Sequence, residues 1–387
     1  MGEMARARPG FSAQTETYLD WNATAPLRSE AAAAMTAMLA RCGNPSSVHR
    51  WGRVARQAIE QAHSAVGALL GVPPESVVFV SGGTEANHLA LLGSASDCVL
   101  VSAVEHDSVL RAVPEAERIP VDCDGVVVLD MLDRLLAADP RPALVSVMLA
   151  NNETGVIQPV AAIGVIARKH GALFHCDAVQ AAGKIALDAH TIGADFVTLS
   201  AHKLGGPPGI GALVVTRELE LTPLLRGGGQ ERGRRAGTEN LAGIAGFAAA
   251  AVAAADEIAV YDRVRALRDA LEAGVAKVTS EAVVLGAAAP RLPNTAAIAM
   301  PGVAAETQVI ALDLDGVMVS AGAACSSGKV GPSHVLEAMG VGPDLVASTI
   351  RVSLGWDSSE ADVDHFLRAW TALYRRCRGS PVGAHAA

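Results

Sequence analysis

The stretch Leu173-Phe174-His175-Cys176, followed by Asp177-Ala178-Val179-Gln180, decides the predicted fold. Its first half shows little alternation of apolar and polar residues, which is typical of a strand buried on both faces of a sheet. A second such run, at residues 196–199, ends in Ser200-Ala201-His202-Lys203. Because open α/β sheets bind ligands at the ends of their strands, we expect the polar groups after these two runs to lie in one site.

The first 255 residues repeat this pattern. Further apolar runs lie at residues 77–80, 98–101, 144–149 and 210–215, with helical or loop-like stretches between them. Short buried strands separated by helices indicate a mostly parallel sheet covered on both faces. The predicted fold class is therefore α/β.

The pattern changes after residue 256. Apolar residues then recur at helical spacing, at Tyr261, Val264, Leu267, Leu271, Val275 and Val278. The last predicted helix begins near Ser359, with Asp362 three positions on as a capping partner. We therefore predict an N-terminal tail at residues 1–17, a large domain at 18–255 and a small C-terminal domain at 256–387.

Composition limits the function classes. The 40 acidic and 31 basic residues of this 387-residue chain leave a formal charge of −9, which gives no support for a nucleic acid or a membrane as partner. The six cysteines form no Cys-x-x-Cys pair, so we expect neither a disulfide framework nor a metal site, and a cytoplasmic location. Residues 1–10 lack the apolar stretch of a secretory signal. Residues 241–255 are shorter than the roughly 20 that cross a bilayer, so we expect a buried helix there.

A glycine turn, Ser81-Gly82-Gly83-Thr84-Glu85-Ala86-Asn87, follows the run at residues 77–80. Backbone N–H groups at a helix N-terminus bind phosphate, and glycine lets a ligand approach the backbone closely. Taken alone, an ordinary strand-to-helix connection explains this turn as well, and Lys203 alone reads as an ordinary solvated lysine. Together with Asp177 they provide what a buried aldehyde cofactor needs: an amine, an anion for the ring nitrogen and donors for the phosphate.

Ten motifs along the chain carry a family resemblance. They are Tyr18-Leu-Asp-Trp-Asn-Ala-Thr-Ala-Pro26, Gly43-Asn-Pro-Ser-Ser47, Ser81-Gly-Gly-Thr-Glu-Ala-Asn87, Glu105-His106, Asn151-Asn-Glu153, Asp177-Ala-Val-Gln180, Ser200-Ala-His-Lys203, Arg226-Gly-Gly-Gly-Gln-Glu-Arg232, Arg235-Ala-Gly-Thr238 and Ser320-Ala-Gly-Ala-Ala-Cys325-Ser-Ser. In this order they resemble the class-V aminotransferase-like cysteine desulfurases, over residues 18–373. So many motifs in one order make the resemblance highly specific.

The resemblance implies a homodimeric fold-type-I transferase that depends on pyridoxal 5'-phosphate (PLP), with a mixed, mostly parallel seven-stranded sheet in the large domain and a smaller α+β C-terminal domain. It implies that Lys203 bonds to the cofactor aldehyde, that Asp177 pairs with the pyridine nitrogen, and that His106 stacks on the ring and relays a proton. The other implied cofactor contacts are Asn152, Gln180, Gly83, Thr84, Ser200, His202 and, from the partner subunit, Thr238. Arg351 is implied to grip the substrate carboxylate, with help from Asn22.

Cys325 lies in a stretch of small residues with two glycines, which reads as a flexible loop. A nucleophilic sulfur must ionise and must travel between substrate and acceptor, so such a loop suits it. We expect the other five cysteines to be inert, buried small hydrophobes. The residues after Cys325 resemble the group that serves iron–sulfur and nitrogenase-type cluster assembly, in which this cysteine can transiently ligate a cluster.

The expected reaction converts L-cysteine to L-alanine and transfers the sulfur to Cys325 as a persulfide, then to an acceptor such as an iron–sulfur scaffold protein. Two alternatives stay open. One is another enzyme of the same family, such as a selenocysteine lyase or an aminotransferase, which would not need Cys325. The other is a scaffold that keeps the fold without turnover, although such a protein usually has a broken cofactor site.

Overall fold

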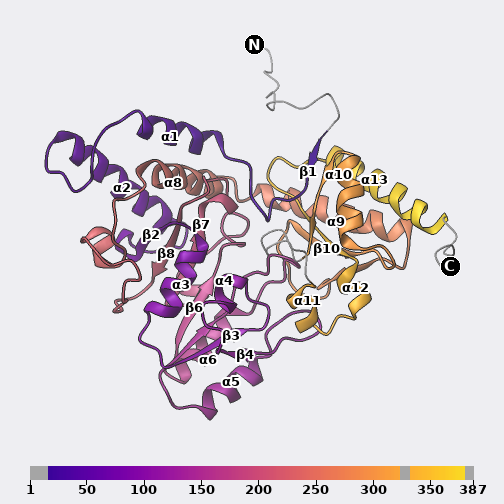
Figure 1. Cartoon of the computed structure of the whole chain (residues 1–387), viewed down its shortest axis with the longest axis horizontal. Coiled ribbons are helices and arrows are strands. Elements are labelled where there is room, and N and C mark those ends of the chain that lie inside the picture. The colour runs from indigo at the N-terminus through magenta and orange to yellow at the C-terminus, as the bar shows by residue number, and fades with distance from the viewer. Residues whose placement is uncertain (1–15, 323–331, 380–387) are drawn as a thin grey trace, which may run out of the picture.

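A mixed sheet forms the centre of the fold. In the computed structural model, which describes residues 16–322 and 332–379, its strand order is β2-β8-β7-β6-β5-β3-β4 (Figure 1). The strands are β2 (Val77–Val80), β3 (Cys98–Ser102), β4 (Glu117–Ile119), β5 (Ala143–Ser146), β6 (Leu173–Asp177), β7 (Phe196–Ser200) and β8 (Gly211–Val215). Only β8 runs antiparallel to its neighbours, and the other pairs are parallel. The predicted α/β class with a mostly parallel seven-stranded sheet is confirmed.

Both faces of this sheet are buried, which explains the unbroken apolar runs. Within β2, Val77 and Phe79 pack into one core and Val78 and Val80 into another. The sequence does not predict β4, because two of its three residues are charged and exposed. In addition, β5 is shorter than the apolar run at 144–149, since it ends at Ser146.

Helices cover the two faces. One face carries α1 (Ser29–Leu39), α2 (Arg50–Ala68), α5 (Leu129–Ala138), α6 (Val160–Lys169), α7 (Ala189–Ile192) and α8 (Leu241–Asp256), all of which contribute to the same core. The other face carries α3 (Gly83–Gly93) and α4 (Asp107–Leu110). Short 3-10 turns are η1 (Pro74–Ser76), η2 (Ala201–Lys203) and η3 (Gln230–Gly233). The carboxyl ends of the parallel strands therefore open beside the N-termini of α3 and α4.

A second core surrounds an antiparallel sheet, ordered β12-β13-β10-β9. Its strands are β9 (Val283–Leu285), β10 (Thr295–Ala299), β12 (Ser320–Ala321) and β13 (Thr349–Ser353). The helices α9 (Val260–Val278), α10 (Ala305–Leu314) and α13 (Glu360–Gly379) pack into this core. The short helices α11 (His334–Ala338) and α12 (Pro343–Ala347) pack with Val104 of the first region. The two regions are thus in direct apolar contact.

The N-terminal segment connects both cores. Strand β1 (Thr17–Tyr18) pairs in parallel with β11 (Val317–Met318), and Leu19 is buried in the second core. The chain then crosses to α1, which packs against α8 of the first region (Figure 1). The domain boundaries at residues 17/18 and 255/256 stay predictions.

The predicted helices of the second region are confirmed. The inward stripe of α9 is buried from Tyr261 to Val275, and α13 begins with the expected capping pair, since Ser359 N and Oγ both donate to Asp362 Oδ2. Residues 241–255 lie in α8, whose inner face belongs to the first core. No single helix of the described chain is long and apolar enough to span a membrane, although α8 and α9 would be so together if they were not bent by 75°.

Candidate active site

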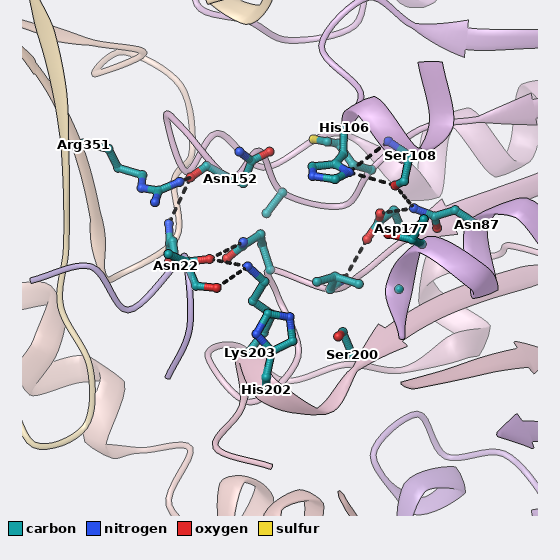
Figure 2. A pocket seen from close by; sticks show the side chains of 17 residues that line it. Asn22, Asn87, His106, Ser108, Asn152, Asp177, Ser200, His202, Lys203 and Arg351 are labelled. Carbon is teal, nitrogen blue, oxygen red and sulfur yellow. Dashed lines mark hydrogen bonds between the residues drawn. The ribbon is translucent and has the colours of Figure 1, made fainter. Parts of the chain in front are cut away.

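A cavity of about 310 Å³ opens at the carboxyl ends of β6 and β7. The predicted site residues that line it are Asn22, Gly83, Thr84, His106, Asn152, Asp177, Gln180, Ser200, His202, Lys203 and Arg351 (Figure 2). Asn87, Ser108 and Met148 also line it, and the sequence does not single them out. The fold therefore brings residues from six separate motifs around one space.

The glycine turn forms one wall of this cavity. Helix α3 begins at Gly83, and its N-cap, Gly82, has no side chain to satisfy the first backbone N–H groups. A Cβ built at Gly83 would come within 3.1 Å of Val179 Cγ2 and 3.6 Å of Ser200 Cβ. Nothing lies within 4 Å of a Cβ built at Gly82. The helix N-terminus thus faces an open space that an anion can approach.

His202 lies beside this wall. Its Nδ1 is 2.7 Å from Thr24 Oγ1. Burial, and after it the positive charge of Lys203, lowers the pKa of His202 to about 4. At neutral pH the ring is therefore uncharged and serves as a hydrogen-bonding group.

The Asp177 side of the cavity, defined as Asp177, Asn87, Ser108 and His106, is one chain of hydrogen bonds (Figure 2). Asn87 Nδ2 donates to Asp177 Oδ2 and to Ser108 Oγ, both at 2.8 Å. Ser108 Oγ in turn lies 2.8 Å from His106 Nδ1. The other carboxylate oxygen, Asp177 Oδ1, accepts the backbone N–H of Val179 at 2.9 Å. These residues belong to the end of β6, to α3 and to the start of α4, so the sheet and the two helices on its face set their spacing.

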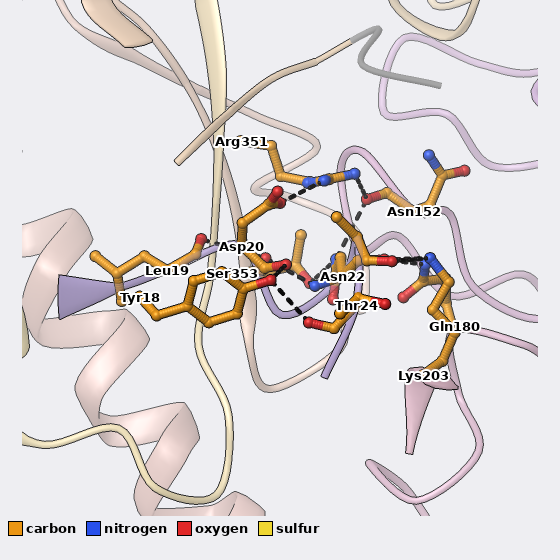
Figure 3. A network of polar contacts seen from close by, with 12 residues as sticks. Tyr18, Leu19, Asp20, Asn22, Thr24, Asn152, Gln180, Lys203, Arg351 and Ser353 are labelled. Carbon is orange, nitrogen blue, oxygen red and sulfur yellow. Dashed lines mark hydrogen bonds and ion pairs between the residues drawn. The ribbon is translucent and has the colours of Figure 1, made fainter. Parts of the chain in front are cut away.

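The Asn22 side is defined as Asn22, Gln180, Lys184, Lys203 and Arg351. Two of its side chains meet at one backbone carbonyl (Figure 3). Asn22 O accepts Lys203 Nζ at 2.6 Å and Gln180 Nε2 at 3.0 Å. Lys203 Nζ also donates to Ala23 O at 2.8 Å. The amine of Lys203 is therefore held by the N-terminal segment, although the lysine itself follows β7.

Lys184 is a buried lysine that the sequence analysis misses. Its Nζ donates to Asn22 Oδ1 and to Gln180 Oε1, both at 2.8 Å. Burial, followed by the charges of Lys203 and Arg351, lowers its pKa well below the usual value. Both bonds run from Nζ to an amide oxygen, so they fix which way the two amide groups face. A signal was available, because Lys184 lies four residues after Gln180, the last residue of one of the resembling motifs. That position alone does not show that the lysine is buried.

Arg351 closes the Asn22 side from β13. Its Nη1 donates to Asn152 O at 3.1 Å, and its Nη2 pairs with Asp20 Oδ1 at 2.7 Å. The residue is only 2% exposed, and its Nε has no hydrogen-bond partner among the described residues. One donor of a buried guanidinium thus remains for a further acceptor.

One predicted site residue, Thr238, does not line the cavity of this chain. Thr238 is exposed between η3 and α8, and Cys325 lies outside the described residues. The expectation that the other five cysteines are buried is wrong for two of them, because Cys42 and Cys123 are exposed. Cys176 is buried as expected, and burial raises the pKa of its thiol well above the usual value. The general tendency of cysteine to be buried, which carried the expectation, does not report the exposure of a particular position.

Known proteins match this chain over nearly its whole length. The family model described as aminotransferase class-V matches residues 17–366, so the chain belongs to this family. A protein named cysteine desulfurase from Cereibacter sphaeroides is 43% identical over 95% of this chain and 98% of its own. An IscS-like cysteine desulfurase from Mycobacterium tuberculosis is 38% identical with the same coverage. The solved structure of a NifS-like protein from Rickettsia africae is 35% identical, with a TM-score of 0.86, over 94% of this chain and all of that one.

The family depends on PLP, and the described residues fit this cofactor. The cavity offers an amine at Lys203, a carboxylate at Asp177 and the open N-terminus of α3. Besides Arg351 Nε, the buried Asn87 Oδ1 has no partner among the described residues. Buried polar atoms are normally paired, so both indicate a polar occupant.

Proposed function

We propose that this protein is a PLP-dependent cysteine desulfurase, which converts L-cysteine and an acceptor thiol to L-alanine and an acceptor persulfide. The observation that carries the proposal is the meeting of the Lys203 amine, the Asp177 carboxylate and the Arg351 guanidinium around one cavity. The names of the relatives, which are 38–43% identical over most of the chain, support the same reaction.

The residues around the cavity divide the work of holding the cofactor. Lys203 bonds to its aldehyde and, once released, holds or moves the substrate's α-proton at Nζ. Asp177 balances the charge of the pyridine nitrogen, and His106 lies against the ring. Gly83, Thr84, Ser200 and His202 hold the phosphate, while Asn152 and Gln180 hold the phenolic oxygen side. When bound, PLP withdraws electrons from the substrate's α-carbon.

Arg351 binds the substrate carboxylate, with Asn22 behind it. Two of its nitrogens already contact Asp20 and Asn152 O, so an incoming carboxylate meets Nε and competes with Asp20 for Nη2. A guanidinium fork is suited to such bidentate binding. The contact with Asp20 keeps the buried guanidinium paired when no substrate is bound.

Cys325 takes the substrate sulfur as a persulfide. The strand that leads toward it, β12, pairs with β13 so that Ser320 lies opposite Arg351. The segment that leads to Cys325 thus begins beside Arg351. In the transfer, the Cys325 thiolate bonds to the substrate sulfur, the bond from that sulfur to the substrate's β-carbon breaks, and the carbon side receives the electron pair and a proton.

The assembly and the sulfur acceptor are parts of this proposal. The protein acts as a cytoplasmic homodimer in which Thr238 of one chain reaches the phosphate of the other. Its acceptor is a protein such as an iron–sulfur scaffold, and Cys325 can ligate the forming cluster transiently. The exposure of Thr238, away from the cavity of its own chain, is consistent with such a role.

The Cys325→Ser variant tests the reaction. A hydroxyl is far harder to ionise than a thiol, so this variant should bind PLP and turn yellow like the wild type, yet form almost no alanine from L-cysteine. Alanine, and sulfide released by an added reductant, are the quantities to measure. In the wild type, mass spectrometry after brief exposure to cysteine should find one added sulfur atom on the peptide containing Cys325.

The matched control is Cys123→Ser, which removes an exposed thiol elsewhere. It should keep full turnover. If Cys325→Ser still forms alanine at the wild-type rate, or the added sulfur sits on Cys42 or Cys123, a lyase that uses no protein thiol becomes the better assignment.

A further inference from the structure

We propose that Glu153 is a positioning residue, which ties the ends of the segment that carries Cys325 to the turn that holds Asn152 at the cavity. This inference rests on the proposed function for its catalytic meaning, because that function gives Cys325 its role. The contacts themselves lie within the described chain, at Gly322 before the segment and at Ser333 after it. The sequence analysis gives Glu153 no role of its own.

The turn that begins at Asn151 is fixed by the side chain of that residue. Asn151 Oδ1 accepts the backbone N–H groups of Glu153 and Thr154, at 2.9 and 3.0 Å. Asn151 Nδ2 donates to Val104 O at 3.0 Å, and all of these residues are buried. Two consecutive residues of this turn face different partners, because Asn152 lines the cavity and Glu153 contacts the second region. The turn therefore keeps the two at a set spacing.

The residue before Glu153 contacts the groups that bind the substrate in the proposed function. Asn152 O accepts Arg351 Nη1 at 3.1 Å and Asn22 Nδ2 at 3.2 Å (Figure 3). Arg351 lies on β13, opposite Ser320 of β12. The start of the Cys325 segment is therefore set against this arginine by the sheet.

The carboxyl group of Glu153 contacts the described residues on both sides of the Cys325 segment. Its Oε2 accepts the Ser333 hydroxyl at 2.6 Å, and the oxygen of that hydroxyl accepts the N–H of Leu336 as the N-cap of α11. A Cβ built at Gly322 would lie 3.3 Å from the same Oε2, so a side chain there would crowd the carboxyl group. Gly322 and Ser333 therefore meet at one oxygen atom.

A second set of contacts holds α11 in place. His334 Nε2 lies 2.9 Å from the backbone oxygen of Glu105. Val335 and Leu336 are buried in one apolar cluster with Val104. Loss of the Glu153 side chain should therefore loosen the start of α11 without detaching the helix from the central region.

The burial of Glu153 favours a specific role over simple packing. Burial raises its pKa, and the hydrogen bond from Ser333 is the largest influence that opposes this rise. An apolar side chain could fill the same space without the cost of burying a carboxyl group. That cost is offset by the contact that the group makes, which is with the residue after the Cys325 segment.

The consequence concerns how the thiolate reaches the substrate. Arg351 binds the substrate carboxylate in the proposed function, so it sets where the substrate sulfur lies. One end of the Cys325 segment is aligned with Arg351 through the β12–β13 pairing, and the other through Glu153 and its neighbour Asn152. A thiolate whose chain starts and ends at fixed points meets the sulfur with a smaller loss of entropy.

Hydrogen–deuterium exchange of the full-length protein tests the contact, with and without PLP. In Glu153→Ala the peptide of residues 332–339 should exchange about fivefold faster, the factor that loss of one hydrogen bond gives. Glu153→Gln keeps an oxygen that accepts the Ser333 hydroxyl, so it should exchange like the wild type. Glu337→Ala removes an exposed carboxylate from the same helix and is the control, with wild-type exchange expected. Unchanged exchange in Glu153→Ala overturns the proposal.

Two reactions of the PLP-loaded enzyme separate the Cys325 segment from the cavity. Exchange of the α-hydrogen of L-alanine in D2O needs the cavity but no protein thiol, whereas alanine formation from cysteine needs Cys325 as well. Glu153→Ala should lower alanine formation about 10- to 100-fold and leave the exchange within about twofold of the wild type. Glu153→Gln should restore alanine formation. Equal losses in both reactions would mean that Glu153 acts on the cavity through Asn152, and the proposal fails.

A double-mutant cycle with Ser333→Ala tests the route of the effect. If Glu153 acts through the Ser333 hydroxyl, the double variant loses no more alanine formation than the more affected single variant. Full additivity of the two losses overturns the proposal. Failure of the wild type itself to form alanine would overturn the proposed function and leave the hydrogen-exchange result standing.

Discussion

The two sides of the cavity hold their polar groups in different ways. On the Asp177 side, the residues come from the end of β6, from α3 and from the start of α4, and their hydrogen bonds stay within that region. On the Asn22 side, the bonds run between the N-terminal segment, the central sheet and the second core, as from Asn22 Nδ2 to Thr295 Oγ1 at 2.9 Å. The first side therefore follows from the sheet and its helices alone. The second exists only when the two cores are packed together, so we expect its substitutions to affect stability as well as chemistry.

The Asp177→Asn variant should show the largest effect, and on the rate alone. Loss of the carboxylate charge removes electrostatic stabilisation at the centre of the reaction, which costs about a hundredfold or more in turnover. The melting temperature should change little, because asparagine keeps the shape and can still accept the N–H of Val179. Alanine formation and thermal unfolding measure the two quantities.

The control for this side is Asp188→Ala, which removes the exposed N-cap of α7. It should cost about 1 kcal/mol of stability and leave turnover unchanged. Near-normal turnover in Asp177→Asn would mean that another residue balances the ring.

The Asn22→Ala variant should lower stability on the other side of the cavity. It removes the oxygen that accepts Lys184 Nζ and Asn294 Nδ2, which leaves buried donors without a partner. Such a loss costs about 2–3 kcal/mol in the free energy of unfolding. Urea unfolding measures it, and the KM for cysteine should rise as well. Asn44→Ala, on an exposed residue, is the control, and equal stability of the two variants would contradict the cross-core role of Asn22.

The pH dependence of stability probes the sheet behind the Asp177 side. Burial lowers the pKa of His175 to about 4, while the unfolded chain titrates near its usual value of 6.5. Between these values the unfolded state binds the extra proton, so stability is full above pH 6.5 and falls by up to about 1.4 kcal/mol per pH unit below it. His175→Gln should flatten this slope in urea unfolding at pH 4.5 to 7. An unchanged slope would show that other groups, such as His202, dominate.

Lys184→Met should have the smallest effect. Methionine fills a similar volume and removes a buried amine whose pKa is already depressed, so we expect stability within about 1 kcal/mol of the wild type. In the background of Asn22→Ala it should restore part of the lost stability, because the unpartnered amine is gone. A double-mutant cycle by urea unfolding measures this coupling. Strict additivity would mean that the 2.8 Å contact contributes nothing.

Sequence reasoning missed residues on both sides of the cavity, and the two arrangements explain why. Asp177 and Lys203 follow apolar runs, and strand ends of one sheet come together by topology. Asn87 and Ser108 were missed, although they are close in sequence to predicted residues. Ser108 is at a helix start, where a polar residue usually has a local role, and nothing local shows that Asn87, inside α3, is buried against Asp177. Family resemblance gave Asn22 and Arg351, but nothing local shows that Lys184 is buried against them.

The contacts of Asn22, in the segment after strand β1, have a consequence for the order in which the protein becomes functional. The backbone and side-chain nitrogen atoms of Asn22 donate to Ser353 and Thr295, more than 270 positions further along the chain. A ribosome delivers Asn22, Lys184 and Lys203 long before it delivers those partners. The central sheet can therefore form early, while Lys184 still lacks a fixed amide oxygen and the carbonyl that receives Lys203 is not yet in place. A nascent or truncated chain then carries every residue of the Asp177 side, but it completes the Asn22 side only after strand β13 is made.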